Sequence, residues 1–446
     1  MKNFFKIYLA NHNRDTSDKL ALFATFASIF SKGIVFIYLI LSIRFTFPYL
    51  EVDRFSMWMT ISSFIGLLAF ADLGLGNATI NEVARVKNKN IKNISKPIST
   101  SLVLSFFLTL TLIVAYLSIE KVIPVNILFR NFDQSILPEA RLSLKIFIIS
   151  FSINIFFSSV HKIFHALQIA YKSHLLMGIC NLFVLGILYF FTKNQLGVPY
   201  LVPLAFLGNI ISGFLLLIVI LLSKFDIFCS LKKINKKYFS EFFKTAGMYL
   251  LLQLGVISMT GADITIVTLF GSPEQVALFA ILIRLFQLIL EPVNLFNYPI
   301  WATIANAESK NDYSHIKSIL IRYTAITIIF ALIGCLLIFV MSDLIFKYIF
   351  SIEIFPESSL IAVYAIQVLI FSSVIPFSMY LNGLKIIKIQ IYSLTTLISI
   401  SIPLKVFLLA YFNLESMILG FFLFYILNFT FWTTLYRDKI FNRLNV

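Results

Sequence analysis

Long apolar stretches separated by short polar segments run along almost the whole chain. An α-helix needs about 20 predominantly apolar residues to cross about 30 Å of hydrocarbon, and twelve stretches have about this length. The first six predicted spans are Leu20–Ile43, Phe55–Asn77, Ile98–Ile119, Leu142–Val160, Leu175–Thr192 and Tyr200–Ser223. The second six are Phe243–Phe270, Val276–Trp301, Ser318–Ser342, Leu360–Leu381, Ile389–Phe412 and Met417–Leu435. The pattern predicts an all-α polytopic membrane protein with twelve transmembrane helices.

The composition supports a lipid environment. Hydrophobic residues make up 59% of the chain and charged residues 13%, and the mean hydropathy is +0.92. A water-soluble fold could not keep so much apolar surface away from water. Membrane lipids are therefore expected partners.

Basic residues concentrate in alternate connections between the spans. With these bounds, 23 of the 36 Lys and Arg residues lie at the N-terminus, in the even-numbered connections and at the C-terminus, against 7 in the odd-numbered connections. Because cytoplasmic connections are enriched in Lys and Arg, we expect both termini to be cytoplasmic. The net charge of +15 could also suit nucleic acid, but basic clusters lie directly beside spans, as at Lys232, Lys233, Lys236 and Lys237. Anionic lipid headgroups explain this charge better, and we expect no nucleic-acid partner.

The longest cytoplasmic connection, residues 224–244, divides six spans from six. It predicts an N-terminal lobe over residues 1–223 and a C-terminal lobe over residues 245–446. Since each lobe holds an even number of spans, both enter from the same side, which predicts a pseudo-twofold axis along the membrane normal. A shift of 224 positions aligns Val52 with Val276, Phe55 with Phe279, Ile65 with Ile289, and Ala78-Thr79-Ile80 with Ala302-Thr303-Ile304. Transporters commonly bind substrate between such halves.

One lysine lies near the middle of the first predicted span. Lys32 is about 12 residues from either end, roughly 18 Å at 1.5 Å per residue, which is too deep for its side chain to reach the interface. An ionisable group at mid-helix costs roughly 2.5 to 3.5 kcal/mol on insertion scales. We therefore expect Lys32 to face the protein interior, lining a hydrated lumen or forming an ion pair within one lobe.

A polar stripe runs along the eighth predicted span. Its members follow a spacing of three and four residues, which places them on one face of a helix: Arg284, Gln287, Glu291, Asn294 and Tyr298. Such a stripe lines an aqueous cavity or joins helices through hydrogen bonds, and its length of about three turns favours the cavity. Pro292 is expected to weaken the helix within the stripe.

Two further charges lie in spans of the second half. Asp263 and Arg284 occupy similar depths on helices that are adjacent in the chain, so these two side chains either form a structural ion pair or act on substrate or protons, and a pair that exchanges with substrate or protons would combine the two. Lys405 lies nearer the outer end of the eleventh span, where it could line the cavity or extend to the interface. Protonation or Na⁺ binding at Asp263 or Glu291 could couple transport to an ion gradient.

The sequence shows no motif typical of an enzyme. It contains no G-x-x-x-x-G-K-[ST] loop, no metal-ligand cluster and no arrangement typical of a nucleophilic catalyst. The odd-numbered connections reach at most about 22 residues, which is short for an extracytoplasmic catalytic domain. We therefore predict no catalytic residues, no metal site and no cofactor apart from a coupling H⁺ or Na⁺.

The segment Phe70-Ala71-Asp72-Leu73-Gly74-Leu75-Gly76-Asn77-Ala78-Thr79-Ile80 resembles the signature of polysaccharide flippases of the Wzx type. These proteins belong to the multidrug/oligosaccharidyl-lipid/polysaccharide (MOP) exporter superfamily, whose members have twelve or fourteen spans in two six-helix lobes. The resemblance covers the span count, the topology and the lobe boundary. Gly74 and Gly76 would let the helix end loosen or approach a neighbour closely, and Asp72 could cap or pair near the cytoplasmic face.

The resemblance implies a function in surface polysaccharide biosynthesis. It implies translocation of an undecaprenyl-pyrophosphate-linked oligosaccharide, such as an O-antigen or capsule repeat unit, across the bacterial cytoplasmic (inner) membrane. It also implies that the protein acts together with a polysaccharide polymerase and a chain-length regulator in lipopolysaccharide biosynthesis. Family members use cationic and acidic lumen residues, which correspond by location to Lys32, Arg284, Asp263 and Glu291.

Other functions remain open on the sequence. A MATE-like drug or cation antiporter would have the same two lobes, although Lys32 and Arg284 suit an anion better than a cation. A membrane glycosyltransferase or O-antigen polymerase would be expected to have larger outer connections. A lipid-binding scaffold without transport would have no evident need for the polar stripe.

Overall fold

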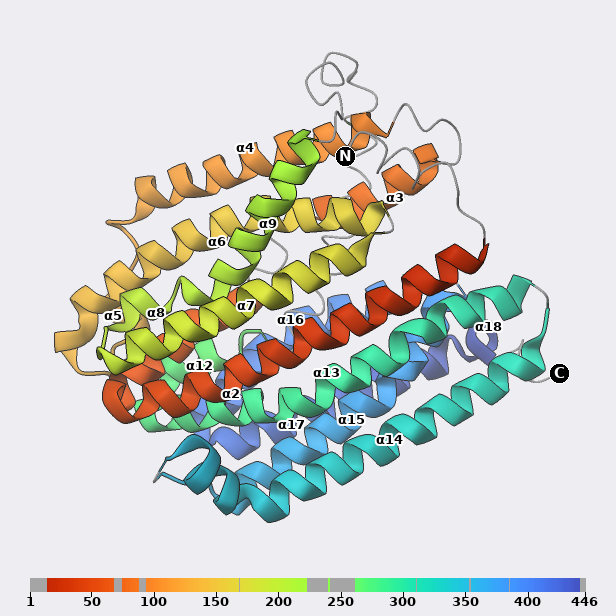
Figure 1. The fold of residues 1–446 in the computed structure, drawn as a ribbon. Coiled ribbons are helices and arrows are strands. Elements are labelled where there is room, and N and C mark those ends of the chain that lie inside the picture. Colours follow the sequence, from red (N-terminus) through yellow and green to blue (C-terminus); the bar gives the residue numbers. More distant parts are fainter. Residues whose placement is uncertain are drawn as a thin grey trace. The chain divides into compact units, whose positions relative to one another are not determined.

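The computed structural model describes residues 14–67, 74–87, 94–167, 169–222, 240, 261–309, 311–352, 354–384 and 386–441. Within these residues every regular element is a helix, as Figure 1 shows. Ten of the described helices are long and apolar enough to cross a membrane. The prediction of an all-α, multi-pass membrane protein is therefore confirmed.

The chain divides into two compact units. Unit 1 comprises Met1–Phe129 and Asp133–Leu254, and unit 2 comprises Arg130–Phe132 and Gly255–Val446. The predicted connection over residues 224–244 lies, apart from residue 240, outside the described residues, as does most of the predicted span Phe243–Phe270.

The helices of unit 1 are α2 (Arg14–Leu67), α3 (Leu75–Lys87), α4 (Ser95–Ile119), α5 (Val125–Leu128), the 3₁₀ helix η2 (Gln134–Ile136), α6 (Leu137–Ala166), α7 (Ala170–Lys193), α8 (Val198–Leu201) and α9 (Leu204–Leu222). Those of unit 2 are α12 (Asp263–Phe270), α13 (Pro273–Ser309), α14 (Tyr313–Leu344), the π-helix η3 (Ile345–Phe350), α15 (Ser358–Gly383), α16 (Ile387–Tyr411), α17 (Leu414–Leu435) and α18 (Arg437–Phe441).

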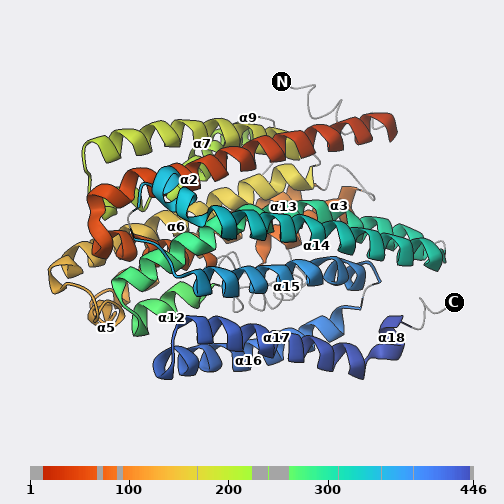
Figure 2. The ribbon, with the colours of Figure 1, turned by 90° about the horizontal axis from the view of Figure 1, so that it is seen from below.

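Small residues let neighbouring helices approach closely within each unit. In unit 1, α2 packs along α7, where a Cβ on Gly178 would lie 2.9 Å from the Phe30 ring. In unit 2, α13 packs against α14 and α15, and α16 packs against α17, as both ribbon views show (Figures 1 and 2). A Cβ on Gly334 of α14 would lie 2.9 Å from Ile289 of α13. Such contacts are the usual basis of helix association in lipid, where the hydrophobic effect does not drive helices together.

Polar side chains cap the N-terminal ends of several helices. The Asp312 carboxylate accepts the His315 backbone N–H at 3.0 Å before α14, and Asn413 accepts that of Ser416 at 2.8 Å before α17. Asp133 accepts hydrogen bonds from the Ser135 backbone N–H and hydroxyl, which lower the pKa of its carboxyl. These caps satisfy backbone groups that the first turn of a helix leaves without partners.

Two residues with positive φ interrupt the helices at the start of the chain. Glu51, with a φ of 60°, divides α2 into two helical segments, so the predicted spans Leu20–Ile43 and Phe55–Asn77 both begin in α2. Gly74 has a φ of 72° and α3 starts at the next residue. The prediction of one continuous helix from Phe55 to Asn77 is therefore wrong at its end, because a left-handed residue cannot continue a right-handed helix.

We expect Gly74→Ala to lower the free energy of unfolding by about 1–2 kcal/mol, because a Cβ is strained at this φ. Gly186 on α7 is the matched control, since nothing lies within 4 Å of a Cβ placed there. Gly186→Ala is expected to be neutral or stabilising by up to about 1 kcal/mol. Thermal unfolding of the two variants in detergent measures the difference, and equal midpoints would contradict a strained role for Gly74.

Candidate functional site

A buried ion pair lies in the middle of unit 2. The Lys405 ammonium on α16 donates to Asp263 Oδ1 on α12 at 2.5 Å, and the two side chains are 1% and 6% exposed. The same ammonium lies 3.7 Å from the ring centroid of Phe421 on α17. A carboxylate and an aromatic face together replace the water that Lys405 would otherwise need.

This pair differs from the one expected from the sequence. A pair between Asp263 and Arg284 was one interpretation of the sequence, and Lys405 was expected to line the cavity or to extend toward the interface. In the structure α12 packs against both α13 and α16, and the cation that reaches the Asp263 carboxylate is Lys405 of α16. Extension of Lys405 to the interface is wrong, since its side chain is enclosed by protein. Position along the chain indicates depth in the membrane but not which of several neighbouring helices supplies the partner.

Tyr364 on α15 connects the ion pair with α13. Its ring is buried and lies 5.9 Å and 5.1 Å from the rings of Phe279 and Phe286 of α13. Asp263 is the charged group that acts on Tyr364 electrostatically, so the ion pair and this aromatic cluster belong to the same buried part of unit 2.

The polar stripe of α13 is half-buried along its described length. Arg284, Gln287, Glu291 and Asn294 all have intermediate exposure, whereas the Tyr298 side chain lies outside the described part of the chain. The buried side of α13 is a different one: Phe286 contacts Tyr364 of α15, and Asn297 donates to Thr327 Oγ1 of α14 at 3.0 Å. The stripe thus lies on a side of α13 that α14 and α15 leave uncovered. The helix continues through Pro292 without interruption.

Lys32 belongs to unit 1, where it is half-buried on α2. The ring of His174 on α7 lies 4.9 Å from that of His165 on α6. A role for Lys32 in lining a hydrated lumen stays a prediction.

A buried histidine joins three helices of unit 1. His161 of α6 lies 2.6 Å through Nδ1 from Ser173 Oγ of α7, and through Nε2 at 3.2 Å from the Asn209 carbonyl of α9. Because a carbonyl only accepts, Nε2 carries the proton and Ser173 donates to Nδ1. The His161 side chain is buried, and no short sequence motif links residues on three separate spans.

The signature segment is only partly described. Gly74 and Gly76 are both buried, at the turn before α3 and in its first turn. Asp72 lies outside the described residues. Among the described residues there is no group of three or more His, Cys, Asp or Glu that could hold a metal ion.

Comparison with known proteins shows a shared fold. No family model and no curated protein sequence matches the chain. Among solved structures, the inward-facing conformation of a multidrug resistance MATE family transporter of the MOP superfamily is 14% identical, with a TM-score of 0.76 over 92% of this chain and 98% of that one. The lipid II flippase MurJ, in an inward closed conformation, is 15% identical, with a TM-score of 0.69 over 92% of this chain and 88% of that one.

A third similar structure is a MOP superfamily transporter from Pyrococcus furiosus whose binding pocket is described as reversed in polarity. It is 14% identical, with a TM-score of 0.65 over 97% of both chains. The chain therefore has the fold of MOP superfamily transporters, and the predicted fold class is confirmed. At this identity the similarity extends to the fold alone.

We expect Asp263→Asn and Lys405→Met each to lower the free energy of unfolding by about 3–5 kcal/mol, because either change leaves one buried charge uncompensated. The double variant Asp263→Leu/Lys405→Met should recover most of this loss. Thermal unfolding of the purified variants measures the coupling. Additive losses in the double variant would show that the two groups do not stabilise each other.

Proposed function

We propose that the chain is a flippase that moves a polyprenyl-pyrophosphate-linked oligosaccharide from the cytoplasmic to the outer leaflet by alternating access. The observation that carries this proposal is the stripe on α13, where Arg284 is only half-buried at a depth that lipid would forbid to a charge. The shared fold supports it, since that fold serves both a lipid II flippase and multidrug transporters.

The chemistry of the cargo suits these residues. A pyrophosphate cannot cross hydrocarbon unaided, and a guanidinium and an ammonium replace its hydration with charge-assisted hydrogen bonds. Arg284 of unit 2 carries a guanidinium and Lys32 of unit 1 carries an ammonium, and either group can make such a contact. Gln287 and Asn294 extend the stripe with amides that can hydrogen-bond sugar hydroxyls, while the prenyl chain remains in lipid.

Glu291 is the first candidate for the residue that couples transport to an ion gradient. Lys405 already supplies a cation to Asp263, so that carboxylate needs neither a proton nor Na⁺ in this conformation. Glu291 is half-buried on the same stripe as Arg284. Protonation or Na⁺ binding at Glu291 would change the net charge of the stripe and with it the affinity for an anion. Asp263 would join only if the ion pair opens during transport.

Position in the cell follows from the same proposal. The chain would lie in the bacterial inner membrane with both termini cytoplasmic, as the distribution of Lys and Arg indicates. The cargo would be an O-antigen or capsule repeat unit, delivered to a polysaccharide polymerase and its chain-length regulator.

A second candidate function is drug or cation antiport. The structural similarity to a multidrug MATE transporter, with a TM-score of 0.76, favours it. A site for organic cations would need an excess of acidic groups. On the described stripe Arg284 balances Glu291, and the carboxylate of Asp263 is taken by Lys405. The flippase therefore accounts for the charges better.

Lys32→Ala and Arg284→Ala should each reduce export of lipid-linked oligosaccharide about 10- to 100-fold, the loss expected for a charge-assisted contact of about 1.5–3 kcal/mol. Surface polysaccharide in cells that depend on the plasmid-borne gene measures export, and membrane levels of the protein measure insertion. Arg322→Ala on α14 and Lys193→Ala on α7 are controls, since both side chains are exposed. Normal polysaccharide in both test variants would remove the proposed anion site.

Translocation in proteoliposomes should respond to a proton or a sodium gradient, and Glu291→Gln should abolish that response while leaving downhill flipping measurable. The amide keeps the size of the side chain but cannot be ionised. Indifference of the unmodified protein to both gradients would exclude coupling. A gradient response that survives in Glu291→Gln but is lost in Asp263→Asn would move the coupling site to the ion pair.

A further inference from the structure

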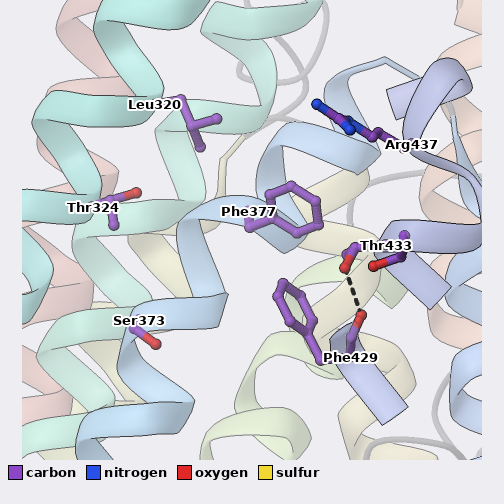
Figure 3. A pocket seen from close by; sticks show the side chains of 8 residues that line it. Leu320, Thr324, Ser373, Phe377, Phe429, Thr433 and Arg437 are labelled. Atoms are coloured by element: carbon purple, nitrogen blue, oxygen red, sulfur yellow. Dashed lines mark hydrogen bonds between the residues drawn. The ribbon is translucent and has the colours of Figure 1, made fainter. Parts of the chain in front are cut away.

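A cavity of about 560 Å³ opens between α14, α15 and α17 of unit 2. Figure 3 shows the Phe377 and Phe429 rings within it and Arg437 at one end. Its lining residues are Leu320, Thr324, Ser373, Phe377, Phe429, Thr433, Thr434 and Arg437. The volume falls within the range of about 300–1,000 Å³ that is typical of small-molecule sites.

The wall of this cavity is apolar in effect, although it contains hydroxyl groups. Ser373 Oγ donates to the Ile370 carbonyl at 2.7 Å, and Thr433 Oγ1 donates to the Phe429 carbonyl at 2.8 Å. Because their protons are used within their own helices, these hydroxyls present mainly methyl and methylene surface and spare lone pairs. An alkyl chain can therefore lie against Ser373 and Thr433 without leaving either hydroxyl donor unsatisfied.

A positive charge lies at one end of the cavity. Arg437 stands on the short helix α18, and the Tyr380 hydroxyl of α15 donates to the Ile440 carbonyl at 2.6 Å, which holds α18 against α15. Among the described residues that line the cavity, Arg437 is the one that carries a charge, and the neighbouring Asp438 is exposed and does not line it. An apolar trough that ends in a guanidinium is complementary to an amphiphile with an anionic head.

The cavity lies on a different side of α15 from the polar stripe. Tyr364 and Gly383 of α15 turn toward α13, where they meet Phe286 and Ile304. Ser373 and Phe377, which line the cavity, lie about half a turn from Tyr364 and about a quarter to a third of a turn from Gly383 around the helix axis. No described residue of the α13 stripe lines the cavity, which favours a resident lipid over the cargo as its occupant.

We propose that this cavity binds one anionic glycerophospholipid of the surrounding bilayer, with an acyl chain along Phe377 and Phe429 and the phosphate at Arg437. The bound lipid would fill the space between α14 and α17, which are otherwise joined through α15. This site is independent of the identity of the transported molecule.

The test is lipid binding by the purified full-length chain, followed by native mass spectrometry during titration with phosphatidylglycerol or phosphatidylcholine. We expect a preference for phosphatidylglycerol of about tenfold or more, which Arg437→Gln abolishes. Arg322→Gln removes the same charge from an exposed site outside the cavity and should change the affinity less than twofold. Ser373→Phe should weaken the binding of both lipids, because the larger side chain fills the trough. Thermal unfolding confirms that each variant is folded.

Three outcomes would overturn the site: equal affinities for the two lipids, equal losses in Arg437→Gln and Arg322→Gln, or displacement of phosphatidylglycerol by an equimolar polyprenyl phosphate. The last would assign the cavity to the cargo. Lys32→Ala and Arg284→Ala should bind phosphatidylglycerol normally, so failure of the flippase proposal and failure of the lipid site are separately visible.

Discussion

Unit 2 depends on one constraint: a charge buried in a membrane cannot be hydrated, so an opposite charge must compensate it. Lys405 and Asp263 lie 142 residues apart in the chain. Each supplies the opposite charge that compensates burial of the other. Phe421 and Tyr364 complete the enclosure and extend it to α17 and α15. Because a buried pair gives little net stability over apolar packing, its presence suggests a role in specifying which helices meet.

Unit 1 uses neutral hydrogen bonds for a similar purpose. His161 joins α6, α7 and α9, and Asn209 adds a bond to Asn154 at 2.7 Å. In hydrocarbon these contacts orient helices whose apolar surfaces alone would pack in many ways. Each unit thus contains a buried polar cluster: His161 and its partners in unit 1, and the Lys405–Asp263 pair in unit 2. The half-buried groups, Lys32 in unit 1 and the α13 stripe in unit 2, do not belong to these clusters.

Much of the fold could be predicted from the sequence, because lipid forces every span to be a long apolar helix and the lengths are set by bilayer thickness. Predicted spans such as Ser318–Ser342 and Leu360–Leu381 coincide with α14 and α15. The face shared by Arg284, Gln287, Glu291 and Asn294 also follows from helical geometry alone, and the structure shows these residues with similar exposure. The break at Gly74 could not be predicted, since glycine is compatible with both helix and turn.

Which helices lie side by side could not be predicted from the sequence. The sequence offered Arg284 on the next helix as a partner of Asp263, whereas α12 lies beside both α13 and α16 and the partner is Lys405 of α16. The bonds of His161 likewise join residues on three spans that carry no common motif. Contacts of this kind depend on which of many similar apolar helices pack together, and the pattern along one helix does not contain that information.

Translocation by the purified protein alone tests the central claim most directly. Vesicles that contain only this chain and a fluorescent polyprenyl-pyrophosphate-linked oligosaccharide would be assayed for the rate at which the label changes leaflet. The account predicts acceleration over protein-free vesicles, competition by unlabelled pyrophosphate lipid and none by organic cations. No acceleration, together with uptake of an organic cation by the same vesicles, would contradict it and favour the antiporter.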